Sequence, residues 1–447
     1  MKIFFMPFGC KVSGYEMQNL EERFTADGHA RTESLAEADV CIINSCTVTA
    51  QADTKLRHFI KRAARANPRC LIVLAGCFPQ AFPDKAKDFT ECGIIVGTKD
   101  KTRIPELVYA RLAEESPPQT VSISPTGVRS LFEPMINTRA AGKTRAYIKI
   151  QDGCDIFCSY CVIPYARGHI CSKPLDDIRR EAAALAASGH RELVITGINI
   201  CCYGRDLADG SRLVHAVEAC CEPEGVDRVR LGSIEPEMLS DEDIARLAAL
   251  PKLCPHFHLS LQSGCAKTLK AMNRRYTPDE YALLCEKLRA AFPGCAITTD
   301  IMAGFPGETE DDHRESLDFV KRIGFAAAHI FPYSRRSGTP ADRMPDQLDN
   351  AVKNRRAAEL AEVCDKTRAE YLRGFVGKTV MVLFEREKSD LFCEGHTPEY
   401  VMVKVPRHNG ESLWKQLLPV RITDIKNGFL FGKINRNTIN GDDTNDL

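Results

Sequence analysis

The sequence predicts an α/β protein of three consecutive domains: a parallel α/β domain, an incomplete (β/α)6 barrel and a small antiparallel β-barrel. Short apolar runs alternate with helical stretches at the start of the chain, as in a parallel sheet covered by helices. The alternation recurs on a larger scale in the middle, and only strand-like runs follow. We expect a first domain at 1–112, a linker at 113–144, the barrel at 145–371, the β-barrel at 372–436 and a flexible tail at 437–447.

Composition indicates a globular protein without membrane segments. The chain has 447 residues, 44% of them hydrophobic, and a formal net charge of zero. No apolar run approaches the roughly 20 residues that a transmembrane helix needs, and the N-terminal run is too short for a signal peptide. We therefore expect a cytoplasmic protein. In that compartment thiols stay reduced, so the 20 cysteines favour metal binding or catalysis over disulfides.

The first domain is expected to contain four parallel strands separated by helices. The strand-like runs are Ile3–Pro7, Val40–Asn44, Leu71–Ala75 and Gly93–Val96. A cysteine follows each of the first three runs, and these cysteines are Cys10, Cys46 and Cys77. Because parallel strands end at one edge of an open sheet, where ligands bind, the three thiols should converge. The spacing leaves two readings open, a metal site and three thiols of the core.

The middle of the chain predicts an incomplete parallel barrel of six strand–helix units, with functional loops at the C-terminal ends of the strands. The strand-like runs are Ala146–Ile150, Glu192–Thr196, Arg228–Leu231, His256–Leu261, Ala296–Met302 and Ala326–Phe331. Helices follow most of them, and one begins with a capping box at Thr277 and Glu280. A long charged helix, Ala351–Leu372, closes the domain.

The loop after the first of these runs carries Cys154, Cys158 and Cys161 in a C-x3-C-x2-C spacing. Three thiolates can hold three irons of a 4Fe–4S cube and leave the fourth iron open for chemistry. A zinc loop is one alternative, although zinc favours paired C-x2–4-C units and needs a fourth ligand. Three unrelated thiols are the other alternative.

The last part of the chain predicts a small antiparallel β-barrel, because its strand-like runs have no helical period between them. The runs are Val376–Phe384, Glu399–Val405, Leu417–Ile425 and Phe429–Ile434. Residues 373–436 contain 11 Lys and Arg against 7 Asp and Glu, a modest basic excess that suggests RNA. Candidate phosphate contacts are Lys378, Arg386, Lys404, Arg407 and Lys415.

Taken together, the motifs resemble those of the radical S-adenosylmethionine (radical-SAM) methylthiotransferases. The resemblance covers essentially the whole chain, and the final domain looks like the family's RNA-binding TRAM domain. The resemblance to the family rests on seven segments, namely Gly9–Glu16, Asn44–Thr49, Gly76–Gln80, the Cys154 loop with its aromatic Tyr160, Arg230–Pro236, Leu259–Gly264 and Asp300–Glu308. The sequence departs from the family pattern at Ser13, Phe78, His169–Lys173 and the Cys201–Cys202 pair.

The resemblance implies two 4Fe–4S clusters and S-adenosylmethionine (SAM) as cofactors. Cys154, Cys158 and Cys161 would hold the cluster that binds and cleaves SAM, and Cys10, Cys46 and Cys77 the auxiliary cluster that supplies sulfur. The radical would take hydrogen from C2 of an adenine, and a second SAM would provide the methyl group. No catalytic residue is expected beyond these six ligands.

The motifs Gly-Cys-Lys-Val and Cys-Thr-Val-Thr most resemble the bacterial branch that acts on N6-threonylcarbamoyladenosine at position 37 of tRNA. Another tRNA base or a ribosomal protein is the alternative substrate. A non-catalytic iron–sulfur protein that binds RNA or senses redox state is an alternative of a different class. The implied partners are the anticodon stem-loop of tRNA, an electron donor such as flavodoxin or ferredoxin, and a sulfur source, with no membrane.

Further contacts are expected from the same resemblance. The SAM contacts would come from one aromatic residue, two polar residues and two glycines at the barrel loops, namely Tyr160, Ser233, Glu235, Gly304 and Gly307. The RNA contacts would come from basic residues near the barrel loops and on the β-barrel, namely Arg167, Arg274, Arg275, Lys378 and Lys404.

Overall fold

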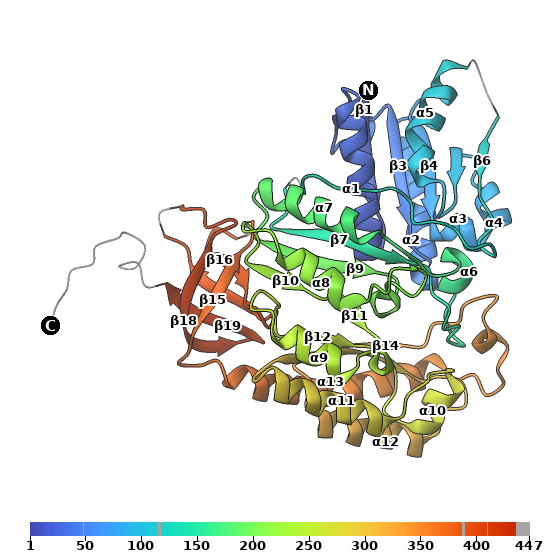
Figure 1. Ribbon diagram of the computed structural model, residues 1–447. Helices are drawn as coiled ribbons and strands as arrows, with labels where there is room; N and C mark the ends of the chain where they lie inside the picture. Colours follow the sequence, from blue (N-terminus) through green and yellow to red (C-terminus); the bar gives the residue numbers. More distant parts are fainter. Residues whose placement is uncertain (48, 115–117, 141, 387–388, 409, 435–447) are drawn as a thin grey trace, which may run out of the picture.

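The computed structural model describes all residues except 48, 115–117, 141, 387–388, 409 and 435–447 (Figure 1). Three domains follow one another along the chain, as the sequence predicted. The first domain lies over one end of the central barrel, and the small β-barrel lies at the other end (Figure 1). The expected tail at 437–447 falls outside the described residues.

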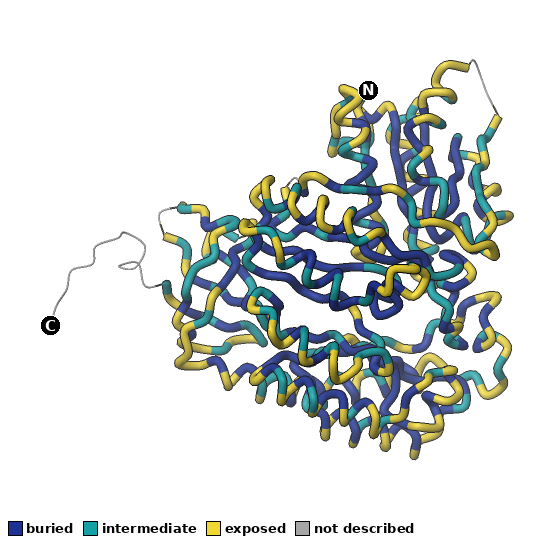
Figure 2. The backbone as a smooth tube through the Cα atoms, in the orientation of Figure 1, coloured by how far each residue is buried: buried dark blue, intermediate teal, exposed yellow. Residues whose placement is uncertain are grey.

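The first domain is a six-stranded parallel sheet in the order β2-β1-β3-β4-β5-β6. Its strands are β1 (Lys2–Pro7), β2 (Ala30–Arg31), β3 (Val40–Ser45), β4 (Leu71–Gly76), β5 (Cys92–Val96) and β6 (Thr120–Ser122). Its helices are α1 (Lys11–Ala26), α2 (Ala50–Ala66), α3 (Cys77–Ala81), α4 (Pro83–Lys87) and α5 (Ile104–Ala113). Both central strands, β3 and β4, are buried along their whole length (Figure 2), because α1 and α5 cover one face of the sheet and α2 and α3 the other.

The segment expected as a linker, 113–144, is instead part of the fold. Its strand β6 extends the first sheet by pairing with β5. Farther along, the segment binds α1, where the Tyr15 hydroxyl donates to the Met135 carbonyl at 2.8 Å and the Asn19 amide donates to the Ile136 carbonyl at 3.0 Å. The sequence did not reveal these anchors because they are single polar contacts without any apolar period.

The central domain forms two four-stranded sheets, β10-β9-β7-β8 and β11-β12-β13-β14. Its strands are β7 (Arg145–Asp152), β8 (Cys171–Ser172), β9 (Glu192–Gly197), β10 (Arg228–Arg230), β11 (Ser233–Ile234), β12 (His256–Leu259), β13 (Ala296–Ala303) and β14 (Ala327–Pro332). Since β10 and β11 are separated by only two residues, the chain continues from one sheet into the other. The predicted parallel strands are all present, and β8 is an additional edge strand that pairs with β7 in antiparallel orientation.

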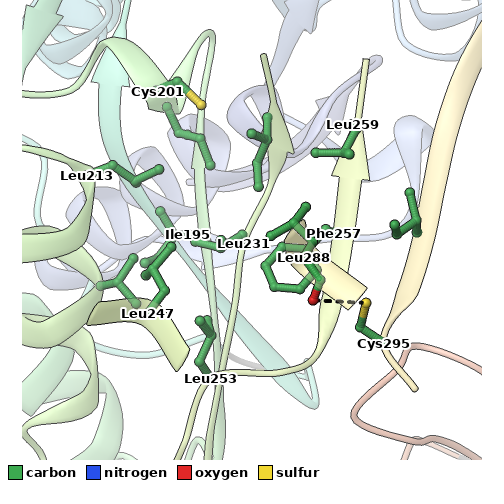
Figure 3. Close-up of a cluster of buried hydrophobic side chains, with 14 of the residues drawn as sticks. Ile195, Cys201, Leu213, Leu231, Leu247, Leu253, Phe257, Leu259, Leu288 and Cys295 are labelled. Carbon is green, nitrogen blue, oxygen red and sulfur yellow. Dashed lines mark hydrogen bonds between the residues drawn. The ribbon is translucent and has the colours of Figure 1, made fainter. Parts of the chain in front are cut away.

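Helices cover the outer face of this curved wall. They are α7 (Leu175–Ala187), α8 (Leu213–Cys221), α9 (Asp241–Ala248), α10 (Ala266–Ala271), α11 (Pro278–Ala291), α12 (Glu310–Ile323) and α13 (Asn350–Arg373). The short helix α6 (Ile163–Arg167) instead packs against α3 of the first domain. Apolar strand residues such as Ile195 and Phe257 pack against helix residues such as Leu247 and Leu288 (Figure 3). The expected capping box at Thr277 and Glu280 is formed at the start of α11.

Strand side chains alternate in direction, so the residues between the apolar ones point to the inside of the barrel. On β7, Ile148 and Ile150 belong to the helix-facing core, which leaves Lys149 on the inner face. On β12 and β13, His258 and Asp300 take the same inward direction. The inner face of the barrel is therefore polar, unlike the outer one.

The C-terminal domain is a closed barrel in the order β15-β16-β17-β19-β18. Its strands are β15 (Thr379–Phe384), β16 (Phe392–His396), β17 (Met402–Pro406), β18 (Leu417–Lys426) and β19 (Phe429–Ile434). Two expectations need correction. The strand β16 was not predicted, and β17 pairs with β19 in parallel, so the barrel is not purely antiparallel.

This β-barrel docks at the N-terminal ends of the central strands. Arg145, the first residue of β7, pairs with Glu385 at 2.7 Å, and Arg228, the first residue of β10, donates to the Met381 carbonyl at 2.6 Å. The Cys154 loop follows the opposite end of β7. In the part of the chain that is described, none of the helices has the length and apolar character to cross a membrane.

Candidate iron–sulfur centres

The loop with Cys154, Cys158 and Cys161 runs from the end of β7 to the start of α6 and has a tightly fixed backbone. Gly153 has φ +74°, and a Cβ there would lie 1.9 Å from the His169 carbonyl oxygen, so only glycine fits. Phe157 also has a positive φ, 53°, which is unfavourable for a bulky residue. Such strain persists where surrounding contacts hold the loop in place.

Those contacts come from the C-terminal end of α10. The Ser159 amide donates to the Met272 carbonyl at 3.0 Å, and its hydroxyl donates to the Ala271 carbonyl at 2.8 Å. The Asn273 side chain donates to the Phe157 carbonyl at 2.9 Å. The three cysteines are thus presented by a loop that is bonded at its centre rather than free to move.

The electrostatics of this trio fit a metal cluster. Burial, together with the neighbouring Cys158, raises the pKa of Cys154 to about 11 and that of Cys161 to about 12. Three thiolates this close would repel one another unless cations compensate them. Arg274 supplies one such cation, because its guanidinium donates to Cys158 Sγ at 3.4 Å. Irons bound by the trio would supply the rest.

The second trio lies where the sequence placed it, at the ends of β1, β3 and β4, which are neighbours in the sheet. Cys10 caps the start of α1, Cys46 follows β3 and Cys77 begins α3. A Cβ at Gly9 would lie 2.9 Å from Cys46 Sγ, and Cys10 lies within electrostatic range of Cys77. The structure therefore brings these three thiols together.

A guanidinium accompanies this trio as well. Arg167 Nε donates to Cys77 Sγ at 3.3 Å. Burial raises the pKa of the Cys77 thiol, and the charge of Arg167 partly offsets that rise. Each trio thus has one sulfur that accepts from an arginine, the arrangement that an anionic thiolate cluster requires.

A buried network of charges joins the two trios across the domain boundary. Glu16 on α1 binds Lys149 on β7 at 2.8 Å and Arg167 on α6 at 2.6 Å, and Arg167 also binds Asp152 at 3.0 Å. Burial opposes ionisation of Glu16, but Arg167, Lys101 and Lys149 hold its pKa well below its ordinary value. The network fixes the first domain against the barrel at the point where the clusters would lie.

A second bridge begins beside Cys46. Arg336, in the loop after β14, donates to Thr47 Oγ1 at 2.5 Å and to Asp53 Oδ2 at 2.9 Å. Sequence analysis missed Glu16, Thr47 and Arg336. Glu16 and Thr47 stand inside the motifs Gly9–Glu16 and Asn44–Thr49, so they were visible there, but nothing in the spacing linked Arg336 to Thr47.

Two of the expected RNA contacts are wrong in this structure, because RNA phosphates require exposed cations. Arg167 is 1% exposed and bound by Glu16 and Asp152. The Arg274 side chain is 3% exposed and is paired with Glu235. Both arginines were expected to contact RNA near the barrel loops, whereas burial next to sulfur and carboxylates gives them a positioning role.

The remaining expected RNA contacts lie at or near the surface. Arg275 and Lys378 are exposed. Lys404 is half-buried, pairs with Glu394 at 2.8 Å and lies over the Phe429 ring. Among these three, Lys378 and Arg275 are the better placed to meet a phosphate.

The expected SAM contacts divide into two groups. Ser233 and Glu235 both point to the inside of the barrel, and Glu235 reaches the Cys154 loop through Arg274, which contacts Cys158. Tyr160 packs edge-on against Phe305 with ring centroids 6.5 Å apart. These three remain predictions.

The two glycines of this set differ from each other. Gly304 has φ +73°, and a Cβ there would lie 2.5 Å from Lys353 Cγ on α13, so its small size serves helix packing. Gly307 also has a positive φ, +76°, but no described atom would come within 4 Å of its Cβ. Contact with a ligand is therefore a better prediction for Gly307 than for Gly304.

Three departures from the family pattern prove to be structural. The Ser13 hydroxyl donates to the Asn44 carbonyl at 3.2 Å. Phe78 is buried against Phe82 and Phe89. Lys173 is buried, binds Glu181 and donates to the Tyr15 hydroxyl at 3.0 Å, which adds another contact between domains.

Comparisons with known proteins agree with this architecture. Family models match residues 148–320, as the radical SAM superfamily, and residues 2–97, as the uncharacterized protein family UPF0004. The threonylcarbamoyladenosine tRNA methylthiotransferase MtaB of Bacillus subtilis is 35% identical over 434 residues, covering 96% of this chain and 95% of its own. The protein of the same name from Thermotoga maritima is 37% identical over 395 residues, covering 88% of this chain and 89% of its own.

A relative named for a different nucleoside is nearly as similar to this chain as these two proteins are. The tRNA-2-methylthio-N(6)-dimethylallyladenosine synthase of Caldicellulosiruptor saccharolyticus is 34% identical over 434 residues, covering 96% of this chain and 91% of its own. Among solved structures, the radical S-adenosylmethionine methyltransferase TsrM from Kitasatospora setae matches with a TM-score of 0.57, 18% identity and 76% of each chain covered. At that identity the structural match shows the fold alone.

Proposed function

The chain belongs to the radical-SAM methylthiotransferases, and from this premise we propose that it adds a methylthio group to C2 of N6-threonylcarbamoyladenosine at position 37 of tRNA. The observation that carries the proposal is the pair of cysteine trios, one in the first domain and one in the central domain, with Arg167 contacting both Cys77 and Asp152, which stands two residues before Cys154. Such an enzyme uses SAM and two 4Fe–4S clusters as cofactors.

The choice of substrate is supported by the names of relatives and by one motif. The relatives from Bacillus subtilis and Thermotoga maritima are named for threonylcarbamoyladenosine, and Gly9–Glu16 resembles that branch. Dimethylallyladenosine is the second candidate, because a relative named for it is 34% identical. A ribosomal protein substrate has no such support among these relatives.

The proposed division of labour follows from which domain holds each trio. When bound, the clusters and SAM supply the radical that removes hydrogen from carbon and the sulfur that replaces it. Cys154, Cys158 and Cys161 would hold the cluster that binds SAM, and Cys10, Cys46 and Cys77 the auxiliary one. The chain itself orients and encloses the reactants, because an exposed carbon radical would react with other groups.

Individual residues have definable tasks in this scheme. Arg274 stabilises negative charge on Cys158 and fixes the Glu235 carboxylate, while Arg167 does the same for Cys77 and Glu16. Ser233 and Glu235 are the candidate polar contacts for SAM on the inner wall. An electron donor such as flavodoxin or ferredoxin, a sulfur source and a cytoplasmic location belong to the same proposal.

Nucleoside analysis of tRNA tests the proposal most directly. Cells that lack the chain should lose the 2-methylthio form of threonylcarbamoyladenosine and accumulate the unmethylthiolated nucleoside. Loss of the 2-methylthio form of dimethylallyladenosine would favour the second candidate, and loss from a ribosomal protein would favour the third. Purified, reduced protein that forms no 5′-deoxyadenosine from SAM would instead indicate a non-catalytic iron–sulfur protein.

A further inference from the structure

Polar side chains on the inner face of the barrel remain accessible to solvent. Ser233 and His329 point inward and are exposed to solvent, although both belong to strands of the wall. His258 and Asp300 form a pair at 3.2 Å there, and their side chains retain 18% and 32% of their exposure. Because solvent reaches these polar groups, they are available for contact with a ligand.

Lys11 of the first domain lies near the inner face of the barrel. It is the first residue of α1, directly after Cys10, and α1 lies against the barrel strands β7 and β9. Its ammonium group lies within electrostatic range of Arg145, Arg230 and Asp300, which belong to the inner faces of three different strands. Lys11 is solvent-exposed in spite of these neighbours.

The other cations around Lys11 have acidic partners. Arg145 pairs with Glu385 at 2.7 Å, and Arg230 pairs with Glu192 at 2.8 Å. Among the described residues, Lys11 makes no hydrogen bond or ion pair. A solvent-accessible ammonium without a partner among the described residues, near two arginines whose carboxylate partners are already engaged, is available to bind an anion.

The two substrate candidates differ in the charge of the group that they carry at N6. The threonylcarbamoyl group ends in a carboxylate, whereas the dimethylallyl group is apolar and uncharged. We propose that Lys11 binds the carboxylate of the threonylcarbamoyl group and so selects this nucleoside over adenosines without a negative charge at N6. This inference rests on the proposed function and identifies the residue that recognises the modified nucleoside.

Because Lys11 directly follows Cys10 in the chain, its contact with the carboxylate has a second consequence. A carboxylate held by Lys11 would fix the modified base next to the auxiliary trio, where sulfur is to be delivered. The methionyl carboxylate of SAM and an RNA phosphate are anions too, and the experiment must separate them from the nucleoside. A charge-assisted hydrogen bond of this kind corresponds to about a tenfold change in affinity.

The experiment uses the anaerobically reconstituted, full-length protein with three anticodon stem-loop RNAs. The first carries threonylcarbamoyladenosine, the second its carboxyl methyl ester, and the third unmodified adenosine. Wild-type protein should bind the ester about tenfold more weakly than the acid. Lys11→Gln should lose about tenfold in affinity for the acid and nothing for the other two RNAs, with KM for SAM unchanged. Lys11→Arg keeps the charge and should retain most of the affinity.

Lys61→Gln is the matched control, because Lys61 is an exposed lysine of α2 in the same domain, and it should behave as wild type. Equal binding of acid and ester by the wild type would overturn the proposal, even if Lys11→Gln failed to load iron. Equal weakening of all three RNAs would indicate a phosphate contact, and a raised KM for SAM would indicate the SAM carboxylate; either result overturns it. Failure of the proposed function is distinct, because then wild-type protein would methylthiolate none of these RNAs.

Discussion

At the scale of single residues, an arginine that donates to one sulfur of each trio separates these cysteines from core thiols such as Cys41, Cys92 and Cys220. Cys41, Cys92 and Cys220 are buried thiols whose pKa is raised chiefly by burial, which is the behaviour of small apolar core residues. Cys158 and Cys77 instead accept hydrogen bonds from Arg274 and Arg167. A cation next to sulfur favours the thiolate, and the thiolate is the metal ligand.

The first prediction concerns one cysteine from each trio. Cys158→Ala should abolish formation of 5′-deoxyadenosine from SAM, because the barrel cluster would lose a ligand. Cys77→Ala should leave that cleavage intact and stop sulfur insertion, which is measured as the methylthio nucleoside. If both variants were to lose both activities while remaining folded, the two trios would not have separate tasks.

The second prediction concerns Gly76, which has φ +100° and whose Cβ would lie 2.4 Å from the Asn44 side-chain oxygen. Gly76→Ala should lower the free energy of unfolding by at least about 3 kcal/mol and reduce iron bound at Cys77, because strain and a clash combine. Gly28→Ala is the control, since Gly28 has φ +83° with no atom within 4 Å. It should cost about 1 kcal/mol and leave the iron content unchanged; equal losses in both variants would contradict the steric argument.

At the scale of elements, the ends of the strands explain why much of the site was predictable. Cys10, Cys46 and Cys77 are distant in sequence, but each follows an apolar run, and parallel runs must end at one edge. The buried network around Glu16 was not predictable in the same way. Arg167 was expected to contact RNA and no role was assigned to Lys149, since the sequence does not reveal which domain will cover them.

The third prediction concerns the pH dependence of that network. The charged form of Glu16 is stabilised in the folded protein, so its stabilisation is fully present above the ordinary carboxyl pKa of about 4.3 and is lost as the pH falls through the lower folded value. Thermal unfolding of the protein should therefore show stability falling below about pH 4.

Glu16→Gln is the variant that isolates this contribution. It should destabilise the protein at neutral pH by about 3–5 kcal/mol, because the buried cations lose their partner, and should show a shallower loss of stability in acid. An acid profile identical to that of the wild type would mean that other carboxylates dominate.

At the scale of the whole molecule, the docking of the β-barrel constrains how RNA can bind. The β-barrel contacts the N-terminal ends of β7 and β10 through Arg145 and Arg228, while the Cys154 loop lies past the other end of β7 (Figure 1). An RNA that meets both must extend along the length of the central domain. The sequence predicted the three domains but not this arrangement, because the docking residues are isolated polar contacts.

The fourth prediction follows from that arrangement. Lys378→Ala should weaken tRNA binding severalfold and lower the salt dependence of the binding constant by about one unit, since one phosphate contact is lost. SAM cleavage without RNA should not change. Lys404→Ala is the control with a smaller expected effect, because Lys404 is already paired with Glu394. A larger loss for Lys404→Ala would place the RNA nearer to Lys404 than to Lys378.

Iron content measured together with Mössbauer spectra tests the central claim most directly. Anaerobically loaded wild-type protein should carry about eight irons per chain as two 4Fe–4S clusters. Replacement of Cys10, Cys46 and Cys77 by alanine should leave about four, and so should replacement of Cys154, Cys158 and Cys161. About four irons in the wild type, unchanged when the first trio is replaced, would contradict the account.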